Sequence, residues 1–455
     1  MISGLFRKLG GESLAARTRR GSILTVLQFG SGNVIRLVSN LILTRLLFPE
    51  AFGLMALVQV VTAGLAMFSD IGLHASLIQN KRAEEPAFFN TAWTIQILRG
   101  LVLAGATVLI SPYVADFYDE PMLAELLPVA ALTAVVAGFR PTKVVTVNRN
   151  MQLGRLTVID ICNQIVSLAL TILLVWWTGT VWGLVYGMVL GAVIRNISLR
   201  LFLPGVGNRL CWEWSAVREL IGFGKYIFIS TFASFVVQNA DKAILGRFIT
   251  IDALGVYTIA LTFASIPRML IRSLTWRIVF PLYSKRRPDQ DLEDRRKIFR
   301  ARYAMTGVVM LGSVLLVVFG KPLIEFLYDP RYYDAAPMTI LVAIGFMPLL
   351  VVHSYDPILL ANGRSDLHAV LTIVHALLKV GALYILILDY GVVGAALSPI
   401  LSTLLYYPLM VVMTRKYRAW DPVHDMLWFA VTLAVILVTY WYIGDTLSEL
   451  TAGRA

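Results

Sequence analysis

Charged residues are scarce in this sequence. Lys, Arg, Asp and Glu make up 15% of its 455 residues, whereas soluble globular proteins carry about 25%. Hydrophobic residues make up 58%, and the mean hydropathy is +0.73. Apolar runs of about 20 residues follow one another with short polar gaps, which is typical of membrane-spanning helices. The composition therefore excludes a soluble globular protein, and the lack of short alternating strand patterns excludes an outer-membrane barrel.

The residues and motifs of several enzyme classes are also missing. The two cysteines, Cys162 and Cys211, lie far apart and fit neither a disulfide framework nor a metal-binding spacing. No glycine-rich loop ends in Lys-Ser or Lys-Thr, so we expect no direct use of ATP. No predicted outer loop is long enough to carry a catalytic domain. We therefore expect a protein that is not an enzyme and that needs no cofactor and no metal ion.

One stretch of the sequence occurs twice. Leu41 to Val58 reads LILTRLLFPEAFGLMALV, and Ala243 to Ala260 reads AILGRFITIDALGVYTIA. A shift of 202 positions superimposes Arg45 on Arg247 and Gly53 on Gly255. Each copy is the end of one apolar run, a short charged turn and the start of the next run. The repeat predicts two copies of one structural unit.

The spacing of the apolar runs predicts an all-α polytopic membrane protein. The first twelve spans form two parallel repeats of six helices, related by an axis along the membrane normal, and the last span is an addition. We expect an N-terminal tail over 1–21, an N-terminal lobe over 22–203, an interfacial linker over 204–221, a C-terminal lobe over 222–413, and an extra span and tail over 414–455. The thirteen predicted spans are 22–47, 52–78, 89–111, 122–145, 155–177, 180–203, 222–247, 253–280, 301–320, 336–361, 366–388, 391–413 and 425–443.

The distribution of basic residues predicts the orientation. The gaps on the side of the N-terminus hold 26 Lys and Arg residues, whereas the opposite gaps hold 5. Because basic loops stay in the cytoplasm, we expect a cytoplasmic N-terminus and an outer C-terminus in a bacterial inner membrane. The net charge of +12 suits contact with anionic membrane lipids rather than nucleic acid.

Polar residues inside the predicted spans are the candidates for a binding site, because each charge at a helix centre costs about 2.5–3.5 kcal/mol on insertion scales. Arginines in a cavity between the two halves would favour an anion, and the planar guanidinium matches phosphate. A structural ion pair of Arg36 with Asp70 or Asp241 is the alternative. The predicted substrate-binding residues are Arg36, Arg268, Arg272, Asn33, Asn40 and Gln238.

A second set of ionisable residues in the spans is a candidate for coupling transport to an ion. Asp70 either caps a bent helix or binds a coupling cation, and Asp241 with Lys242 forms either an internal pair or part of such a site. Histidine titrates near neutral pH and suits a proton relay. The predicted ion-coupling residues are Asp70, Asp241, Lys242, His353, Asp356, His375 and Lys379.

Three stretches carry a resemblance to a known family: LTRLLFPEAFGLMALV, FSDIGLHASLIQ and the segment from Gly222 to Pro267. The last contains Asn-Ala-Asp ending at Asp241, then Gly-Arg ending at Arg247, then Leu-Gly-Val-Tyr ending at Tyr257. The chain resembles bacterial polysaccharide transporters of the multidrug/oligosaccharidyl-lipid/polysaccharide exporter superfamily, in the branch of Wzx-like oligosaccharide flippases.

The resemblance implies two six-helix lobes, a V-shaped central cavity and alternating access. It implies a substrate of undecaprenyl diphosphate carrying a short oligosaccharide, with arginines of the first and eighth spans on the diphosphate. Arg36 and Arg268 match those arginines by helix and depth. Members of this branch often have fourteen spans, so the predicted thirteen leave the C-terminal topology open.

The expected partners are lipid-linked oligosaccharide, membrane lipids, and the polymerase and glycosyltransferases of the same pathway. We expect a monomer. The alternative function is an ion-coupled exporter of another substrate, either a peptidoglycan lipid precursor or a small molecule. A cationic drug would favour an acidic cavity, whereas the predicted cavity is basic.

Overall fold

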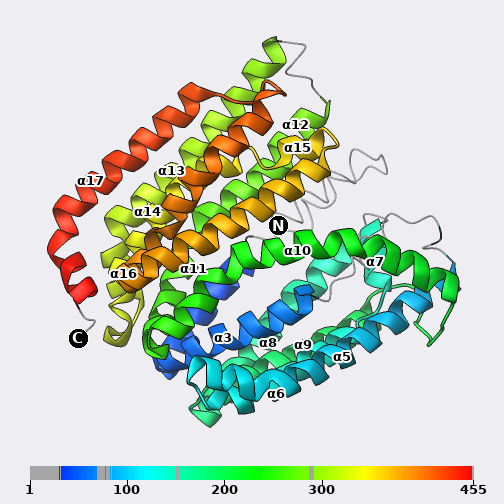
Figure 1. Ribbon diagram of the computed structural model, residues 1–455. Helices are drawn as coiled ribbons and strands as arrows, with labels where there is room; N and C mark the ends of the chain where they lie inside the picture. The colour runs from blue at the N-terminus through cyan, green and yellow to red at the C-terminus, as the bar shows by residue number, and fades with distance from the viewer. Residues whose placement is uncertain are drawn as a thin grey trace, which may run out of the picture. The chain divides into compact units, whose positions relative to one another are not determined.

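The computed structural model describes residues 30, 32–68, 77, 82, 85–149, 153–285 and 292–452. Over these ranges all regular structure is helical (Figure 1). Nine helical stretches of the described residues are long and apolar enough to cross a membrane. The predicted all-α polytopic fold is therefore confirmed.

The described residues divide into two compact units. The N-terminal unit comprises the residues up to Leu47 and those from Val58 to Thr231, and the C-terminal unit comprises Phe48–Leu57 and the residues from Phe232 onward. One boundary lies just before α3 (Pro49–Phe68), and the other two fall inside α3 and α10 (Trp214–Phe248).

The N-terminal unit is built from helices that pack mainly as sequential neighbours, α5 on α6 and α8 on α9, with α6 also packed on α9. The predicted span 122–145 is interrupted after Gly138, where Pro141 lacks the N–H that a continuous helix would need. Besides a helical segment over 32–46, this unit contains α5 (Pro86–Tyr118), α6 (Met122–Gly138), α7 (Lys143–Arg149), α8 (Leu153–Thr178) and α9 (Trp182–Phe202).

The C-terminal unit is organised around α14 (Ala335–His353), which packs against α11, α13, α16 and α17. Nearly every residue of α14 is apolar and buried, as expected for a helix enclosed on all sides. Its other helices are α11 (Ile251–Leu274), η2 (Thr275–Val279), α12 (Phe280–Lys285), α13 (Leu292–Leu327), η3 (Pro330–Tyr332), α15 (Pro357–Ala361), α16 (Ser365–Arg415) and α17 (Pro422–Ala452).

Helix α16 contains two of the predicted spans, 366–388 and 391–413. They are joined at Gly391, whose φ of 54° and ψ of −129° are not helical. A residue with a Cβ atom adopts this region only with strain, so glycine permits the bend. The two spans thus remain distinct helices joined by one residue.

The two copies of the repeated sequence contact each other in the structure. A Cβ atom on Gly53 of α3 would collide with the carbonyl oxygen of Ile251, and one on Gly255 of α11 would collide with that of Pro49. Pro49 and Ile251 are themselves equivalent under the 202-residue shift. The starts of α3 and α11 therefore cross closely and symmetrically within the C-terminal unit, and each crossing point requires a glycine.

The region between α9 and α10 has no regular secondary structure over 204–213, and α10 begins at Trp214, inside the predicted linker 204–221. The backbone of this region runs along the start of α5, where the N–H groups of Arg209, Cys211 and Glu213 donate to three side chains of that helix at 3.0–3.1 Å. The acceptors are Asn90, Thr94 and Thr91. Alternate residues of this segment are thus held on one helix.

Charged side chains add to this attachment. Arg82 donates to Glu213 at 2.7 Å and also contacts Glu85 and Glu219. The Glu213 carboxylate accepts hydrogen bonds from Ser215 and Arg82, which lower its pKa below the usual range. Hydrogen bonds to Glu85 and Glu213 raise the pKa of Arg82. The ionised pair therefore helps to hold the linker in place.

Candidate functional site

One face of α8 is polar along most of its length. Asp160, Asn163, Gln164, Ser167 and Thr171 follow one another at intervals of one to four residues, which places them on one side of a helix. Residues of the opposite side are apolar and exposed at the helix surface, including Val158, Ile165 and Leu173. A membrane helix with such a stripe is expected to turn it away from lipid.

The polar face of α8 lines a cavity of about 560 Å³ inside the N-terminal unit. This volume lies within the range of about 300–1,000 Å³ that is usual for small-molecule sites. Besides the α8 residues, the helix over 32–46 contributes Gly32, Ile35, Arg36 and Ser39, and α9 contributes Gly187, Met188, Gly191, Ala192 and Arg195.

Two glycines bring α9 close to the polar face of α8. A Cβ atom on Gly187 would collide with the hydroxyl of Thr171, and one on Gly191 would lie 2.8 Å from the hydroxyl of Ser167. Membrane helices commonly use small residues for such close packing. The two glycines therefore let α8 and α9 pack closely beside the cavity that both helices line.

The charges around this cavity do not balance. Arg195 forms an ion pair with Asp160 at 2.9 Å, from α9 to α8. Arg36 is exposed and lines the same cavity, and no carboxylate among the described residues forms an ion pair with it. The cavity therefore has two guanidinium groups and one carboxylate in its wall.

The other predicted residues of this unit lie elsewhere. Asn33 and Asn40 are partly buried on the same helix as Arg36 but do not line the cavity. Asp70, predicted as a cation ligand or helix cap, lies outside the described residues.

A second polar cluster lies in the C-terminal unit and pairs Asp241 of α10 with Lys379 of α16. The Lys379 Nζ atom lies 3.7 Å from the Asp241 Oδ1 atom. Asp241 is only 7% exposed and Lys379 only 6%. The Lys379 ammonium also donates to the carbonyl of Val237 at 2.6 Å, and the Tyr257 hydroxyl donates to Asp241 at 3.3 Å. The internal partner of Asp241 is thus Lys379 rather than its neighbour Lys242, because α16 brings a distant residue to it.

Arg268 lies near this cluster, with its guanidinium stacked 4.5 Å from the centre of the Phe346 ring. Arg272 follows one turn later on α11 and is exposed. Gln238 is exposed and donates to the carbonyl of Ser234, one turn earlier on its own helix. Of the three predicted contacts in this unit, Arg268 is therefore the one that is partly buried.

The predicted histidines are held by neighbours in the same unit. His353 contacts Asp356 at 2.6 Å where α14 ends, and His375 stacks on Tyr406 with the ring centres 4.8 Å apart. Among the described residues, no group of His, Cys, Asp and Glu side chains has the arrangement of a metal site.

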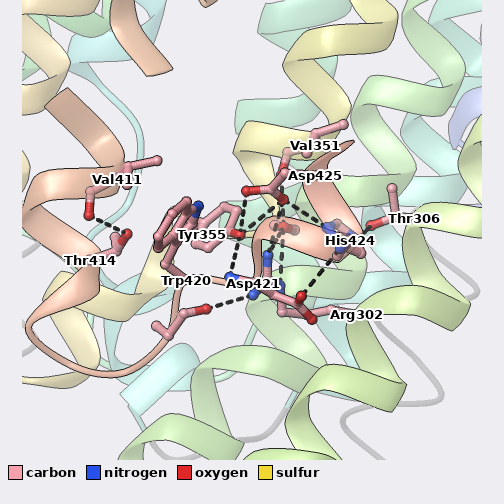
Figure 2. Close-up of polar contacts among 12 residues, drawn as sticks. Arg302, Thr306, Val351, Tyr355, Val411, Thr414, Trp420, Asp421, His424 and Asp425 are labelled. Carbon is pink, nitrogen blue, oxygen red and sulfur yellow. Dashed lines mark hydrogen bonds and ion pairs between the residues drawn. The ribbon is translucent and has the colours of Figure 1, made fainter. Parts of the chain in front are cut away.

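A buried network whose residues are not among the predicted sites ties α17 to the rest of the C-terminal unit (Figure 2). The Arg302 guanidinium of α13 stacks 3.7 Å from the centre of the Tyr355 ring and lies 3.8 Å from Asp425. The hydroxyls of Tyr355 and Tyr407 each donate to Asp425 at 2.8 Å. Asp425 therefore accepts hydrogen bonds from the turn after α14 and from α16, and it forms an ion pair with α13.

The remaining contacts of the network are satisfied as well. Arg302 donates to the Ala419 carbonyl at 2.8 Å and to the Ser354 hydroxyl at 3.2 Å. His424 bridges Asp425 at 2.8 Å and Thr306 at 3.1 Å. Arg302 and Asp425 are each only 1% exposed, so this network has a structural role. The Asp-Pro-Val-His-Asp sequence at the start of α17 was the only available signal for it.

A second cavity of the N-terminal unit, also about 560 Å³, contains two arginines that the sequence prediction omitted. Arg99 donates to the carbonyl of Ala66, and Gln96 donates to the carbonyls of Ala137, Gly138 and Arg140. The side chain of Arg140 lines the same space. These groups mainly join α5 to the end of α6.

An all-helical membrane protein with a polar, positively charged cavity inside one of its helix units has the features of a membrane transport protein. The chain belongs to the polysaccharide biosynthesis protein family, whose model matches residues 42–337. The predicted resemblance to polysaccharide transporters is thereby confirmed.

Two relatives extend over most of the chain. The lipopolysaccharide biosynthesis protein WzxC of Escherichia coli (strain K12) is 22% identical over 447 residues, which covers 94% of this chain and 87% of WzxC. The succinoglycan biosynthesis transport protein ExoT of Rhizobium meliloti (strain 1021) is also 22% identical and covers 90% of this chain and 76% of ExoT.

Solved structures show the same fold. The lipid II flippase MurJ, in an inward closed conformation, aligns with a TM-score of 0.67 at 14% identity and covers 93% of this chain and 92% of MurJ. An inward-facing multidrug resistance MATE family transporter of the MOP superfamily aligns with a TM-score of 0.62 at 12% identity and covers 85% of this chain and 95% of that one.

Proposed function

We propose that the protein translocates undecaprenyl-diphosphate-linked oligosaccharide units from the inner to the outer leaflet of the bacterial inner membrane, by alternating access, for polysaccharide biosynthesis. Family membership and the names of the relatives support a role in polysaccharide export. The observation that carries the proposal is Arg36, a cation in a membrane helix that lines a polar cavity without a carboxylate partner among the described residues.

Arg36 is suited to the diphosphate of such a substrate. A guanidinium offers parallel N–H groups to two phosphate oxygens and remains charged at every physiological pH. A cation inside a membrane protein is costly unless it pairs with an anion, and a bound diphosphate supplies that anion. Arg268 is proposed as a further contact, with Arg272, Gln238, Asn33 and Asn40 retained as predicted contributors.

Asp241 and Lys379 are proposed as the ion-coupling pair of the C-terminal unit, because a buried carboxylate and ammonium 3.7 Å apart respond to protonation or cation binding. The predictions for Asp70, Lys242, His353, Asp356 and His375 belong to the same hypothesis. A substrate shifts the transport equilibrium only by its differential affinity for the two states, so net export needs such coupling or removal of product outside.

The polymerase and glycosyltransferases of the same pathway are the proposed partners, and the protein is proposed to act as a monomer. The alternative of a peptidoglycan-precursor exporter has less support, since the likeness to MurJ at 14% identity is a likeness of fold.

A leaflet assay tests this function. In a strain lacking the gene and any redundant flippase, a membrane-impermeant reagent labels the outer-leaflet pool of lipid-linked oligosaccharide. We expect accumulation in the inner leaflet that the wild type reverses. Arg36→Ala should reduce the rate about tenfold or more, because charge-assisted hydrogen bonds contribute about 1.5–3 kcal/mol each.

The control variant is Arg209→Ala, which removes an exposed arginine of the linker and should restore transport at equal protein levels. An unchanged leaflet distribution in the deletion strain would contradict the function itself. Full transport by Arg36→Ala would contradict the assignment of Arg36 alone.

A further inference from the structure

The wall of the cavity beside Arg36 contains hydrogen-bond acceptors as well as donors, whereas a diphosphate requires donors. A phosphate group only accepts hydrogen bonds at its ionised oxygens, so a dedicated phosphate site presents donors. The α8 wall of this cavity instead mixes a carboxylate, two amides and two hydroxyls, from Asp160 to Thr171. Binding of a diphosphate therefore does not account for most of the polar side chains in the cavity wall.

We propose that this cavity is a sugar-binding subsite, which holds the sugar unit next to the diphosphate while Arg36 contacts the phosphates. The inference rests on the proposed function and adds the substrate specificity of the same site. The residues assigned to the sugar are Asp160, Asn163, Gln164, Ser167 and Arg195.

The mixture of groups matches a sugar ring. Each sugar hydroxyl both donates and accepts, and amides, carboxylates and hydroxyls offer the complementary atoms at short range. With Arg36 assigned to the phosphates, the remaining charges of the wall are those of the Arg195–Asp160 ion pair, which balance, so the cavity suits a neutral sugar.

Asn163, a residue of the cavity wall, has a hydrogen-bond donor that is unused within the part of the chain that the structure describes. It is only 6% exposed, and its Oδ1 atom accepts a hydrogen bond from the Ser198 hydroxyl at 2.9 Å. Its Nδ2 atom is buried and has no acceptor among the described residues. A buried donor without a partner costs about 1–3 kcal/mol. Because the Nδ2 atom has almost no accessible surface, a sugar oxygen accepts from it once the side chain turns toward the cavity.

The position of Arg36 fits binding of the diphosphate and the first sugar side by side. In a lipid-linked oligosaccharide the first sugar is bonded directly to the diphosphate, so the two must bind side by side. Arg36 and Gln164 line one cavity from facing helices, and Gln164 lies against Gly32, one turn before Arg36. Phosphates on Arg36 would therefore place the first sugar against α8.

Two variants separate sugar binding from phosphate binding. Gln164→Leu keeps the size of an exposed side chain and removes its hydrogen bonds. Asn163→Leu removes the buried donor. The matched control is Val166→Leu, on the same helix but outside the cavity lining, where the side chain is exposed at the helix surface.

The experiment compares two lipids bound to the full-length protein in nanodiscs. One is undecaprenyl diphosphate without sugar, and the other is the lipid-linked repeat unit extracted from the deletion strain. We expect the wild type and Val166→Leu to bind the sugar-bearing lipid about tenfold more tightly, equivalent to one or two hydrogen bonds. Gln164→Leu and Asn163→Leu should lower that ratio to about twofold while binding the sugar-free lipid as the wild type does.

A thermal unfolding measurement of the lipid-free protein provides a second readout. Asn163→Leu combined with Ser198→Ala should raise the unfolding temperature relative to Ser198→Ala alone, because it removes a donor that has no partner in the described part of the chain without depriving the Ser198 hydroxyl of its acceptor. An asparagine with a structural role would lower the temperature when replaced.

Three results would overturn the inference. If both variants retain the wild-type ratio, or if the wild type binds the two lipids equally, the cavity does not bind sugar, although the proposed function stands. If the wild type binds neither lipid, the proposed function fails, and the subsite fails with it.

Discussion

At the scale of single residues, one type of side chain has a structural role in one environment and is a candidate for binding in another. Arg302 lies in a helix that is long and apolar enough to cross a membrane, and Arg36 lies in the predicted first span. Arg302 is enclosed by Tyr355, Ser354 and Asp425 and has a structural role, whereas Arg36 lines a cavity. The partners of a charge, rather than its presence, therefore separate structural residues from candidates for binding.

The first prediction concerns the Arg302–Asp425 pair. Asp425→Ala should cost about 3–5 kcal/mol of unfolding free energy, because it leaves the Arg302 charge buried without its counterion. Thermal unfolding in detergent measures the loss. Replacing both residues, Arg302→Met with Asp425→Leu, should be less harmful than Asp425→Ala.

The control for this prediction is Asp366→Ala, which breaks the ion pair of Arg364 with Asp366. Both side chains of that pair are largely exposed, so the change should stay within about 1 kcal/mol. If Asp366→Ala and Asp425→Ala lowered the free energy of unfolding equally, burial would not determine how much an ion pair contributes to stability.

At the scale of helices, the crossing of α3 and α11 depends on two glycines. Gly53→Val and Gly255→Val should each destabilise the protein by about 1–3 kcal/mol, because the new side chain would collide with a backbone carbonyl. Gly312→Val on α13 is the control, since open space surrounds that position. Unfolding temperatures as low for Gly312→Val as for Gly53→Val would argue against the crossing.

The attachment of the linker to α5 should depend on pH. The pKa of Glu213 is lowered in the folded protein, so its contribution is complete above the unfolded value of about 4.3 and is lost as the pH falls through the folded-state pKa. Hydrogen-exchange protection factors of residues 204–213 should therefore fall below about pH 4.

Glu213→Gln is the control for this pH effect. It should already reduce protection at neutral pH, since the ionised partner of Arg82 is lost. It should then show a smaller further decrease in acid. Equal pH profiles for the variant and the wild type would assign the effect to another group.

At the scale of the whole molecule, the basic residues predict the orientation in the membrane. Alkaline phosphatase fused after residue 455 should be active, because it folds only outside the cytoplasm, and green fluorescent protein at the same position should not fluoresce. A fusion ending at Asp421, before α17, should show the opposite result. Fluorescence at both positions would place the C-terminus in the cytoplasm and remove the thirteenth span.

The fold was largely predictable, whereas the site was predictable only in part. Apolar runs locate membrane helices because lipid requires them, and Arg36 was found because a charge in such a run is rare. Asn163, Gln164, Ser167 and Thr171 were not singled out, although their helical spacing was visible in the sequence. Their shared cavity appears only when α8 and α9 are packed together.

The sequence by itself determined the membrane-spanning, all-helical class, the internal repeat and the family resemblance, because these follow from local composition and spacing. Only the tertiary structure decided which charges have partners. Lys379 is more than a hundred residues from Asp241, and Asp425 is more than a hundred from Arg302, yet each pair is in contact. Ion pairs between helices depend on packing geometry, which is not encoded at any single position of the chain.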